Sequence, residues 1–281
     1  MIPDLHMHTT ASDGTLAPME LVEYAAGRGV TIMAVTDHDT FEGADSLRGA
    51  DTPIPVITGV ELSMKDMKGL HLLGYGMTDA PQLRQTVRDL AQKRLTRAAR
   101  IVEKLNQMGF PLDYEDIRRS AKGTVGRLNI ARAMVEKGYV RNTEAAFNKY
   151  IGEGREGYVP NESLTMAQAL PLMRQNGFVP VLAHPAELEI KETMLRMLIE
   201  SWQQQGLMGV EVYHPSQQKR GFASLDATVL RMGLLVTGGS DFHSGTDRRH
   251  GQPGCTAVHW HNAQDDVNAL LEAIRWEAQK I

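Results

Sequence analysis

The sequence has little cysteine and no long hydrophobic run. Cys255 is the only cysteine among 281 residues, so the chain can form neither an internal disulfide nor a cysteine-based zinc finger. No window approaches 18 consecutive apolar residues, so we predict no membrane-spanning segment. The first residues, MIPDLHMHTTASDG, lack the basic and apolar regions of a secretory signal peptide. With cysteine so scarce, we expect a cytoplasmic protein.

The remaining composition is that of an ordinary globular protein. Hydrophobic residues make up 42% of the chain and charged residues 23%, which argues against global disorder, a collagen-like chain or a coiled coil. The formal net charge is −4, but the charges are unevenly spread. Residues 81–132 contain twelve Lys and Arg and only five Asp and Glu. Such a basic region can steer an anionic ligand toward one part of the surface.

Short apolar runs alternate with helical patterns over most of the chain. This alternation predicts an α/β protein with a parallel sheet or barrel. The runs that predict strands are 2–5, 31–36, 55–62, 70–75, 178–183, 208–213 and 234–238. The windows that predict helices around them are 17–27, 166–175, 190–205, 222–232 and 264–279.

The middle of the chain has a different pattern. No convincing strand occurs between residues 81 and 150, where apolar residues recur at helical spacing. A long helix is predicted up to Gly109, with shorter ones at 113–120, 127–137 and 143–150. The basic residues of the long helix are Arg84, Arg88, Arg97, Arg100 and Lys104, which we interpret mainly as a solvated face. We therefore predict a helical insertion domain at 81–160, within a barrel domain formed by 1–80 and 161–281.

Histidines and carboxylates gather around the predicted strand ends. His6 and His8 form an H-x-H pair, and residues two apart on a strand point to the same face. Most of the set falls at or just after the carboxyl end of a strand, which is the active-site face of a β/α barrel. The nine residues that we predict as metal ligands are His6, His8, Asp13, His38, Glu61, His71, His184, Asp241 and His243.

The chemistry of this set favours more than one metal ion. Imidazole suits zinc, iron and manganese, and carboxylates can bridge two ions. Six histidines and three carboxylates exceed what one tetrahedral ion needs, so we expect two or three divalent ions (Mn, Fe or Zn). Ions held close together can clamp a phosphoryl group and activate hydroxide for attack.

Several segments together resemble a known family. DLHMHTTASDGTL, AVTDHDT, PVITGVELS, GLHLLGYG, VLAHP and GGSDFHS resemble the PHP (polymerase and histidinol phosphatase) family of metal-dependent phosphoesterases. TVGRLNIARAMVEKGYV and FNKYIGEGREGYVP resemble the helical domain of its small bacterial subgroup. That subgroup contains a 5′→3′ exoribonuclease of short RNAs and a 3′-phosphatase of nucleoside 3′,5′-bisphosphates. The resemblance implies a distorted seven-stranded β/α barrel with a helical insertion that covers the substrate.

The resemblance also implies how the nine ligands divide. One ion would take His6, His8, Asp241 and a bridging Glu61. The second would take Glu61, His71 and His184. The third would take Asp13, His38 and His243.

Substrate contacts are predicted in the insertion. Arg127 lies at a predicted helix start, and its guanidinium fork matches phosphate oxygens. Asn129 stands where family members often have His, and Arg155 is flanked by two glutamates. Tyr158 could stack on a base, and His214 follows a strand and could contact substrate or protonate a leaving group. The predicted substrate-binding residues are Arg127, Asn129, Arg132, Arg155 and Tyr158, with His214 as a possible catalytic residue.

These observations favour a phosphoesterase that acts on a nucleotide or short RNA, through attack by metal-activated hydroxide. We expect a phosphorylated small molecule, nucleotide or short RNA as ligand, with no membrane and no protein partner evident. Three alternatives stay open: a histidinol-phosphate phosphatase, a metal-dependent amidohydrolase, whose barrel also begins with H-x-H, and a non-enzymatic module.

Overall fold

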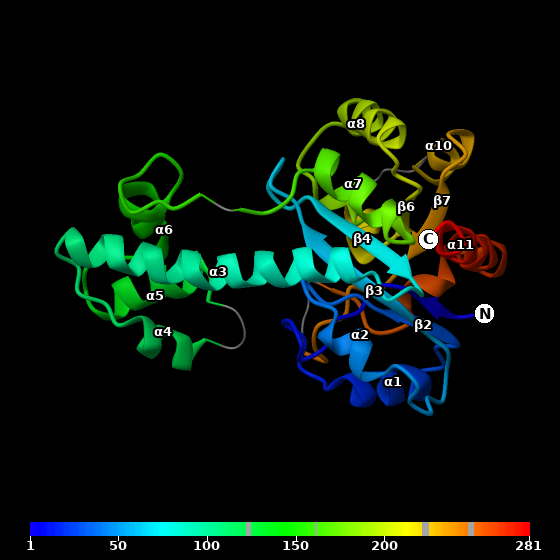
Figure 1. Cartoon of the computed structure of the whole chain (residues 1–281), viewed down its shortest axis with the longest axis horizontal. Coiled ribbons are helices and arrows are strands. Elements are labelled where there is room, and N and C mark those ends of the chain that lie inside the picture. The colour runs from blue at the N-terminus through cyan, green and yellow to red at the C-terminus, as the bar shows by residue number, and fades with distance from the viewer. Residues whose placement is uncertain (122–124, 161, 221–224, 247–249) are drawn as a thin grey trace. The chain divides into compact units, whose positions relative to one another are not determined.

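The protein is described by a computed structural model that covers residues 1–121, 125–160, 162–220, 225–246 and 250–281. The chain divides into two compact units, which we describe separately. The barrel unit comprises residues 1–87 and 163–281, and the helical unit comprises residues 88–162 (Figure 1).

Seven strands make up the barrel unit, in the order in which they occur along the chain. All neighbouring strands pair in parallel except the fourth, β4, which runs antiparallel to both its neighbours. The expectation of a parallel sheet is therefore wrong for this strand. Only residues 64–70 connect it to β3, whereas a parallel crossover needs about a dozen residues or more. The strands are β1 (Pro3–Asp4), β2 (Ile32–Val35), β3 (Val56–Ser63), β4 (His71–Gly76), β5 (Phe178–Leu182), β6 (Gly209–Tyr213) and β7 (Leu235–Gly238).

Hydrogen bonds between the first and last strands nearly close the sheet. The backbone N–H of Leu5 donates to the carbonyl of Gly238 at 3.0 Å. Beyond the strands, Asp241 N–H donates to the His6 carbonyl at 2.8 Å, and His8 N–H to the Phe242 carbonyl at 2.9 Å. The result is the seven-stranded, nearly closed barrel that we predicted, and the residues just after β1 and β7 lie side by side.

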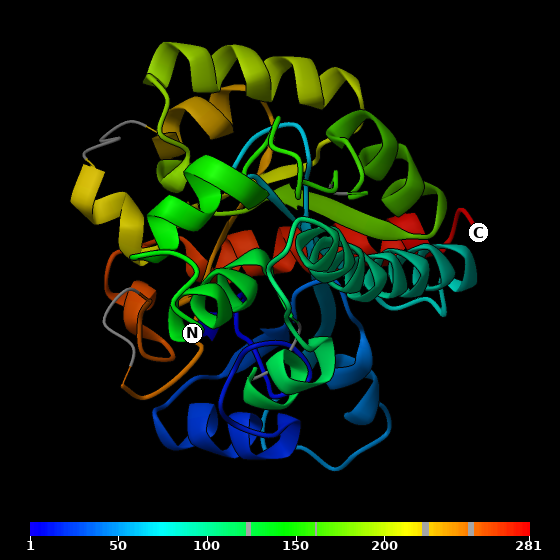
Figure 2. The ribbon, with the colours of Figure 1, turned by 90° about the vertical axis from the view of Figure 1, so that its left-hand side faces the viewer.

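Helices surround the strands of the barrel unit (Figures 1 and 2). Helices α1 and α2 contact β2, α7 contacts β5, α10 contacts β7, and α11 contacts both β5 and β7. Apolar clusters fill the space between these layers. The helices are α1 (Pro18–Gly27), α2 (Glu42–Ser46), α7 (Met166–Gln175), α8 (Glu192–Gln204), α9 (Pro215–Arg220), α10 (Leu225–Arg231) and α11 (Ala263–Ala278), with short 3-10 turns η2 (Pro185–Glu187) and η3 (Cys255–Val258). Residues 222–224 of the helix predicted at 222–232 lie outside the described residues.

The long helix α3 (Pro81–Gln107) contributes to both units. Its first turns belong to the barrel unit, where Leu83 and Val87 join the main core. Arg84 there is nearly buried, pairs with Asp45 and lies 4.4 Å from the ring centroid of Phe41. The interpretation of Arg84 as part of a solvated face is therefore wrong.

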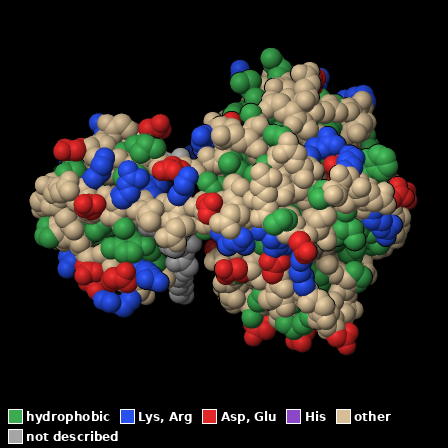
Figure 3. All heavy atoms as spheres, viewed as in Figure 1, with side chains coloured by type: hydrophobic (Ala, Val, Ile, Leu, Met, Phe, Trp, Pro, Cys, Tyr) green, Lys and Arg blue, Asp and Glu red, His purple; other side chains and the backbone are tan. Residues whose placement is uncertain are grey.

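The helical unit packs the rest of α3 against shorter helices. Its core contains Ile101 and Leu105 of α3, which meet Ile130 and Met134 of α5. Lys104 of α3 donates to the carbonyl of Tyr158 at 2.9 Å and so ties this helix to the end of the unit. The remaining elements are α4 (Tyr114–Ser120), α5 (Arg127–Glu136), α6 (Thr143–Ala146) and a π-helical turn, η1 (Phe147–Ile151). Figure 3 shows basic and acidic side chains interspersed over the visible face of this unit.

Among the described residues, no helix combines the length and the apolar character that crossing a bilayer requires.

Candidate metal centre

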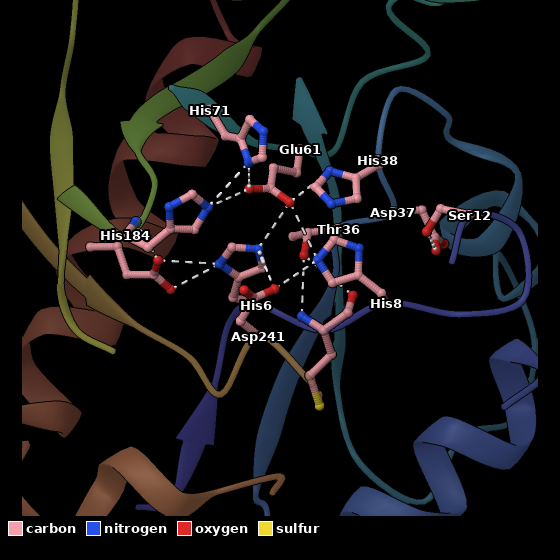
Figure 4. Close-up of polar contacts among 12 residues, drawn as sticks. His6, His8, Ser12, Thr36, Asp37, His38, Glu61, His71, His184 and Asp241 are labelled. Carbon is pink, nitrogen blue, oxygen red and sulfur yellow. Dashed lines mark hydrogen bonds and ion pairs between the residues drawn. The ribbon is translucent and has the colours of Figure 1, made fainter. Parts of the chain in front are cut away.

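The H-x-H pair that follows β1 points into the barrel. Met7, between the two histidines, packs instead into the outer cluster with Leu21 of α1. His6 and His8 are both fully buried. Their alternation about Met7 directs both imidazoles toward Glu61, as the period of two predicts (Figure 4).

Glu61 lies at the centre of the histidine cluster. Its Oε2 atom lies 3.2 Å from Nε2 of His6 and 3.3 Å from Nε2 of His8. Its Oε1 atom lies 2.9 Å from Nδ1 of His71 and 2.8 Å from Nε2 of His184. One carboxylate thus faces two pairs of imidazoles with different oxygens, which is the geometry of a ligand shared between two ions.

The direction of β4 explains how His71 reaches this cluster. Because β4 is antiparallel, its first residue lies at the same edge as the last residues of its neighbours, and Ser63 at the end of β3 pairs with His71. The imidazole nitrogens of His71 and His184 come within 3.2 Å of each other. Two ring nitrogens at this distance beside one carboxylate could share an ion.

Asp241 completes the set around the H-x-H pair. Its Oδ1 atom lies 3.1 Å from Nε2 of His8 and 3.4 Å from Nε2 of His6. His6, His8, Glu61 and Asp241 each offer one ligand atom within 4.8 Å of the others.

A third group lies toward the exposed side of the site. Asp13, half exposed, has Oδ1 3.2 Å from Nε2 of His243, and its Oδ2 atom is 3.9 Å from Nε2 of His38. His8 also reaches this group through Nδ1. His38 contacts Glu61 as well, at 2.9 Å, so His8 and His38 connect this group to the others.

Strained backbone occurs at the site. Non-glycine residues rarely adopt positive φ angles, and such strain often marks functional sites. Three of the four examples among the described residues lie here: Asp39 (φ 50°), His184 (φ 24°) and Asp241 (φ 53°).

Unsatisfied polar atoms test whether this cluster fits metal ions. Buried polar atoms normally have hydrogen-bond partners. Among the described residues, several buried atoms that point at the centre of the site have none. They are Nε2 of His6, both ring nitrogens of His8, Nδ1 of His38, Oε2 of Glu61 and Oδ1 of Asp241. Convergent nitrogen and oxygen lone pairs without donors suit divalent cations, so the residues fit the predicted ions.

Mutual attraction shifts the pKa values of the cluster in opposite directions. Burial alone would lower the pKa of His6, but the carboxylates of Glu211 and Glu61 outweigh it and raise that pKa well above its usual value. Burial would likewise lower the pKa of His38. Glu61 outweighs this effect and raises that pKa to about 9. Burial would raise the pKa of Glu61, yet His38 and His6 hold it well below its usual value. A divalent ion would displace the protons that the imidazoles hold here.

Asp37 and Asp4 position the backbone around the cluster. Asp37 accepts hydrogen bonds from Thr9 N–H at 2.7 Å and from the hydroxyl of Ser12 at 2.6 Å, so it fixes the loop that carries Asp13. Asp4 accepts from the backbone N–H of Ser240 at 2.9 Å, just before Asp241.

Sequence reasoning missed Glu211, the buried carboxylate of β6. Its Oε1 atom lies 3.0 Å from Nδ1 of His6, and its Oε2 atom accepts from the backbone N–H of His184 at 2.7 Å. A signal was available, because an acidic residue stands in the middle of the apolar run GVEVY. Burial would raise the pKa of Glu211, but His6 lowers it, so the group stays ionised.

Two further histidines contact Asp241. His214, the possible catalytic residue, is almost fully buried, with Nε2 3.5 Å from Oδ2 of Asp241. The Ser216 backbone N–H donates to its Nδ1 atom, so a neutral His214 carries its proton on Nε2. His250, which is not among the predicted site residues, has its Nε2 atom 3.4 Å from Oδ2 of Asp241. Its ring stacks on His243, with centroids 4.3 Å apart.

The five predicted substrate-binding residues all belong to the helical unit. The guanidinium carbon of Arg127, at the start of α5, lies 5.4 Å from the ring centroid of Phe147 and 5.7 Å from that of Tyr158. Arg97 also approaches Tyr158, at 5.8 Å. Arg127, Tyr158 and Arg97 therefore form a cationic and aromatic cluster.

The other three of these residues have different surroundings. The side-chain oxygen of Asn129 accepts from the backbone N–H of Gly126 at 2.9 Å, which caps the start of α5. Arg132 and Arg155 are exposed.

The nearly closed barrel and its convergent histidines and carboxylates are typical of a metal-dependent hydrolase. The model of the PHP domain family matches residues 4–161, and the chain belongs to this family. This confirms the resemblance seen in the sequence.

Relatives of known name are phosphoesterases. A protein of Haemophilus influenzae described as a 5′-3′ exoribonuclease is 33% identical over 244 residues, which cover 85% of this chain and 89% of the relative. A 3′,5′-nucleoside bisphosphate phosphatase of Chromobacterium violaceum is 30% identical over 247 residues, covering 86% and 87%. This chain is accordingly a metal-dependent hydrolase of phosphoric esters.

One solved structure has a similar fold and a different description. An amidohydrolase from Chromobacterium violaceum, with bound sulfate and no metal, has a TM-score of 0.70 and 28% sequence identity. The match covers 95% of this chain and 97% of that one.

Proposed function

We propose that this protein hydrolyses phosphate esters of nucleotides or short RNA, as a nucleoside 3′,5′-bisphosphate 3′-phosphatase, a 5′→3′ exoribonuclease or both. The observation that carries the proposal is the convergence of imidazole nitrogens on the two oxygens of Glu61, where Oε2 and the nitrogens of His6 and His8 that face it have no hydrogen-bond partner. The names of the two relatives supply the substrate class. The cytoplasmic location expected from the sequence stays a prediction.

The nine predicted ligands would hold two or three divalent ions, of Mn, Fe or Zn. His6, His8, Asp241 and Glu61 would bind one, and Glu61, His71 and His184 a second. Asp13, His38 and His243 would bind a third. Such ions would activate water for attack on phosphorus and neutralise the phosphate oxygens. The side chains themselves contribute a fixed, largely buried arrangement that needs little reorganisation when substrate binds.

The helical unit would bind part of the substrate. Arg127 and Tyr158 carry most of this role, because a guanidinium group beside an aromatic ring can hold a phosphate next to a stacked base. Arg132 and Arg155 would add positive charge, and Asn129 would contribute through its amide nitrogen. The insertion at 81–160 is accordingly proposed as a substrate-binding domain.

A metal-dependent amidohydrolase is the second candidate. The description of the Chromobacterium violaceum structure favours it. Against it, the two relatives named above act on phosphate esters. Amide hydrolysis therefore belongs in the test as a separate arm.

The test is a substrate comparison with the Mn-loaded protein. The substrates are adenosine 3′,5′-bisphosphate, a 5′-phosphorylated RNA oligomer, histidinol phosphate and an N-acyl amino acid. A His8→Ala/Asp241→Ala protein is the control. We expect phosphate from the bisphosphate or 5′-mononucleotides from the RNA, and neither from the control. Turnover of histidinol phosphate or the amide alone would contradict the proposal.

A further inference from the structure

One buried carboxylate outside the predicted ligand set contacts ligands of two metal positions. Glu211, on β6, is fully buried in the barrel. It belongs to none of the groups of described residues whose ligand atoms converge. Both of its oxygens nevertheless contact residues that do face the centre, His6 and His184.

The contact between Glu211 and His6 determines which ring nitrogen of His6 carries the proton. Nε2 of His6 faces Oε2 of Glu61 at 3.2 Å and Oδ1 of Asp241 at 3.4 Å. Nδ1, on the other side of the ring, lies 3.0 and 3.2 Å from the two oxygens of Glu211. A carboxylate there requires a proton on Nδ1, which leaves the Nε2 lone pair free to bind an ion.

The contact with His184 acts on the backbone. His184 has φ 24° and ψ 58°, a conformation that histidine rarely adopts. Its backbone N–H donates to Oε2 of Glu211 at 2.7 Å. This bond holds the strained residue, whose Nε2 atom thereby reaches Oε1 of Glu61 at 2.8 Å.

The two contacts together require a carboxylate of this length. The His184 N–H can only donate, and Nδ1 of His6 must donate if Nε2 binds an ion. Glutamine offers one oxygen and one NH₂ group, so its NH₂ would oppose one of the two donors. Aspartate is one methylene shorter and cannot keep both contacts without backbone movement.

We infer that Glu211 is a positioning residue for two metal positions at once, through the tautomer of His6 and the backbone of His184. This inference rests on the proposed metal-dependent function. It predicts that loss of one carboxylate, which itself binds no ion, weakens binding at both positions.

The test compares Glu211→Gln with a matched control, Glu277→Gln. Glu277 is also a buried carboxylate of the barrel unit, but it pairs with Arg174 and Lys280. Metal-free wild type and variants are titrated with Mn²⁺ by equilibrium dialysis against a competing chelator. We expect Glu211→Gln to bind about 10- to 100-fold more weakly at two positions. Glu277→Gln should bind as the wild type does, and His184→Ala should be weakened at one position.

A spectroscopic readout separates positioning from simple destabilisation. In metal-free wild type held at a pH above the pKa of His6, long-range ¹H–¹⁵N correlations should place the proton of the neutral ring on Nδ1, and Glu211→Gln should shift this tautomer equilibrium toward Nε2. If Glu211→Gln does not fold, Glu211→Asp tests the same contacts and should weaken Mn²⁺ binding. Wild-type affinity at both positions in whichever variant folds would overturn the inference. A wild type that binds no Mn²⁺ would instead overturn the proposed function.

Discussion

Replacing Gly43 by alanine should disturb the site through Asp37. A Cβ atom on Gly43 would lie 1.9 Å from Oδ2 of Asp37 and 2.6 Å from Oγ1 of Thr9. Real Cβ atoms essentially never approach another heavy atom within 3.0 Å, so the carboxylate must retreat by about 1 Å. Its hydrogen bonds with Thr9 and Ser12, now 2.6–2.8 Å long, cannot survive that movement.

The expected loss of stability follows from these contacts. Hydrogen bonds to a charged group contribute about 1.5–3 kcal/mol each, and overpacking costs about 1–3 kcal/mol. Because water can replace part of what is lost near Ser12, we expect the free energy of unfolding to fall by about 3 kcal/mol. Metal binding by Asp13, His38 and His243 should weaken as well, since Asp37 fixes the loop that carries Asp13.

Urea denaturation of the metal-free proteins measures this change. Gly27→Ala is the matched control, because Gly27 is the exposed last residue of α1 and a Cβ there meets no atom within 4 Å. The control should be unchanged or more stable by up to about 1 kcal/mol. A Gly43→Ala protein within about 0.5 kcal/mol of wild type would refute the reasoning.

Three further predictions concern substrate, pH and metal. Arg127→Ala should raise KM for a nucleotide substrate about tenfold or more, with a smaller effect on kcat. The control is Arg118→Ala, which removes an exposed arginine paired with Glu115 and should leave KM unchanged. An Arg127→Ala protein with the KM of wild type would contradict the role of Arg127. Burial would raise the pKa of Glu277, but Lys280 and Arg174 lower it, so its contribution to stability is present above the unfolded-state pKa of about 4.5 and is lost as pH falls through the lower folded-state value. Glu277→Gln should therefore cost about 1–3 kcal/mol in urea denaturation at pH 7 and less near pH 3, and a pH-independent difference would contradict this. Chelation of bound metal should lower Tm, since a metal ion at 100 times its Kd stabilises the folded state by about 2.7 kcal/mol. A metal-free protein whose Tm does not rise when the metal is added back would count against specific binding.

The positions of the strands along the chain could be predicted because each is a short apolar run bounded by polar, glycine or proline residues. The direction of β4 was not predicted, although only residues 64–70 separate it from β3, too few for a parallel crossover. That direction explains why His71, at the start of its strand, joins residues at the ends of the others.

Most of the predicted ligand residues come together because they stand at or just beyond a strand end, where the barrel geometry decides their place. Residues defined by loops or by burial were harder to predict. His250 lies in a loop with no periodic pattern, and Glu211 stands inside an apolar run whose sequence does not say which side chains the carboxylate contacts. Asn129 was assigned to substrate from a family position, whereas the structure shows its oxygen capping α5.

The central claim is that the side chains around Glu61 bind several divalent ions. The most direct measurement is the number of Mn ions that the folded chain retains after loading and dialysis, in wild type and in Glu61→Gln. We predict two or three ions per chain in wild type and fewer in Glu61→Gln, because this carboxylate faces two groups of imidazoles. A correctly folded wild type that retains fewer than one ion per chain, or a Glu61→Gln protein that retains as many as wild type, would contradict the account.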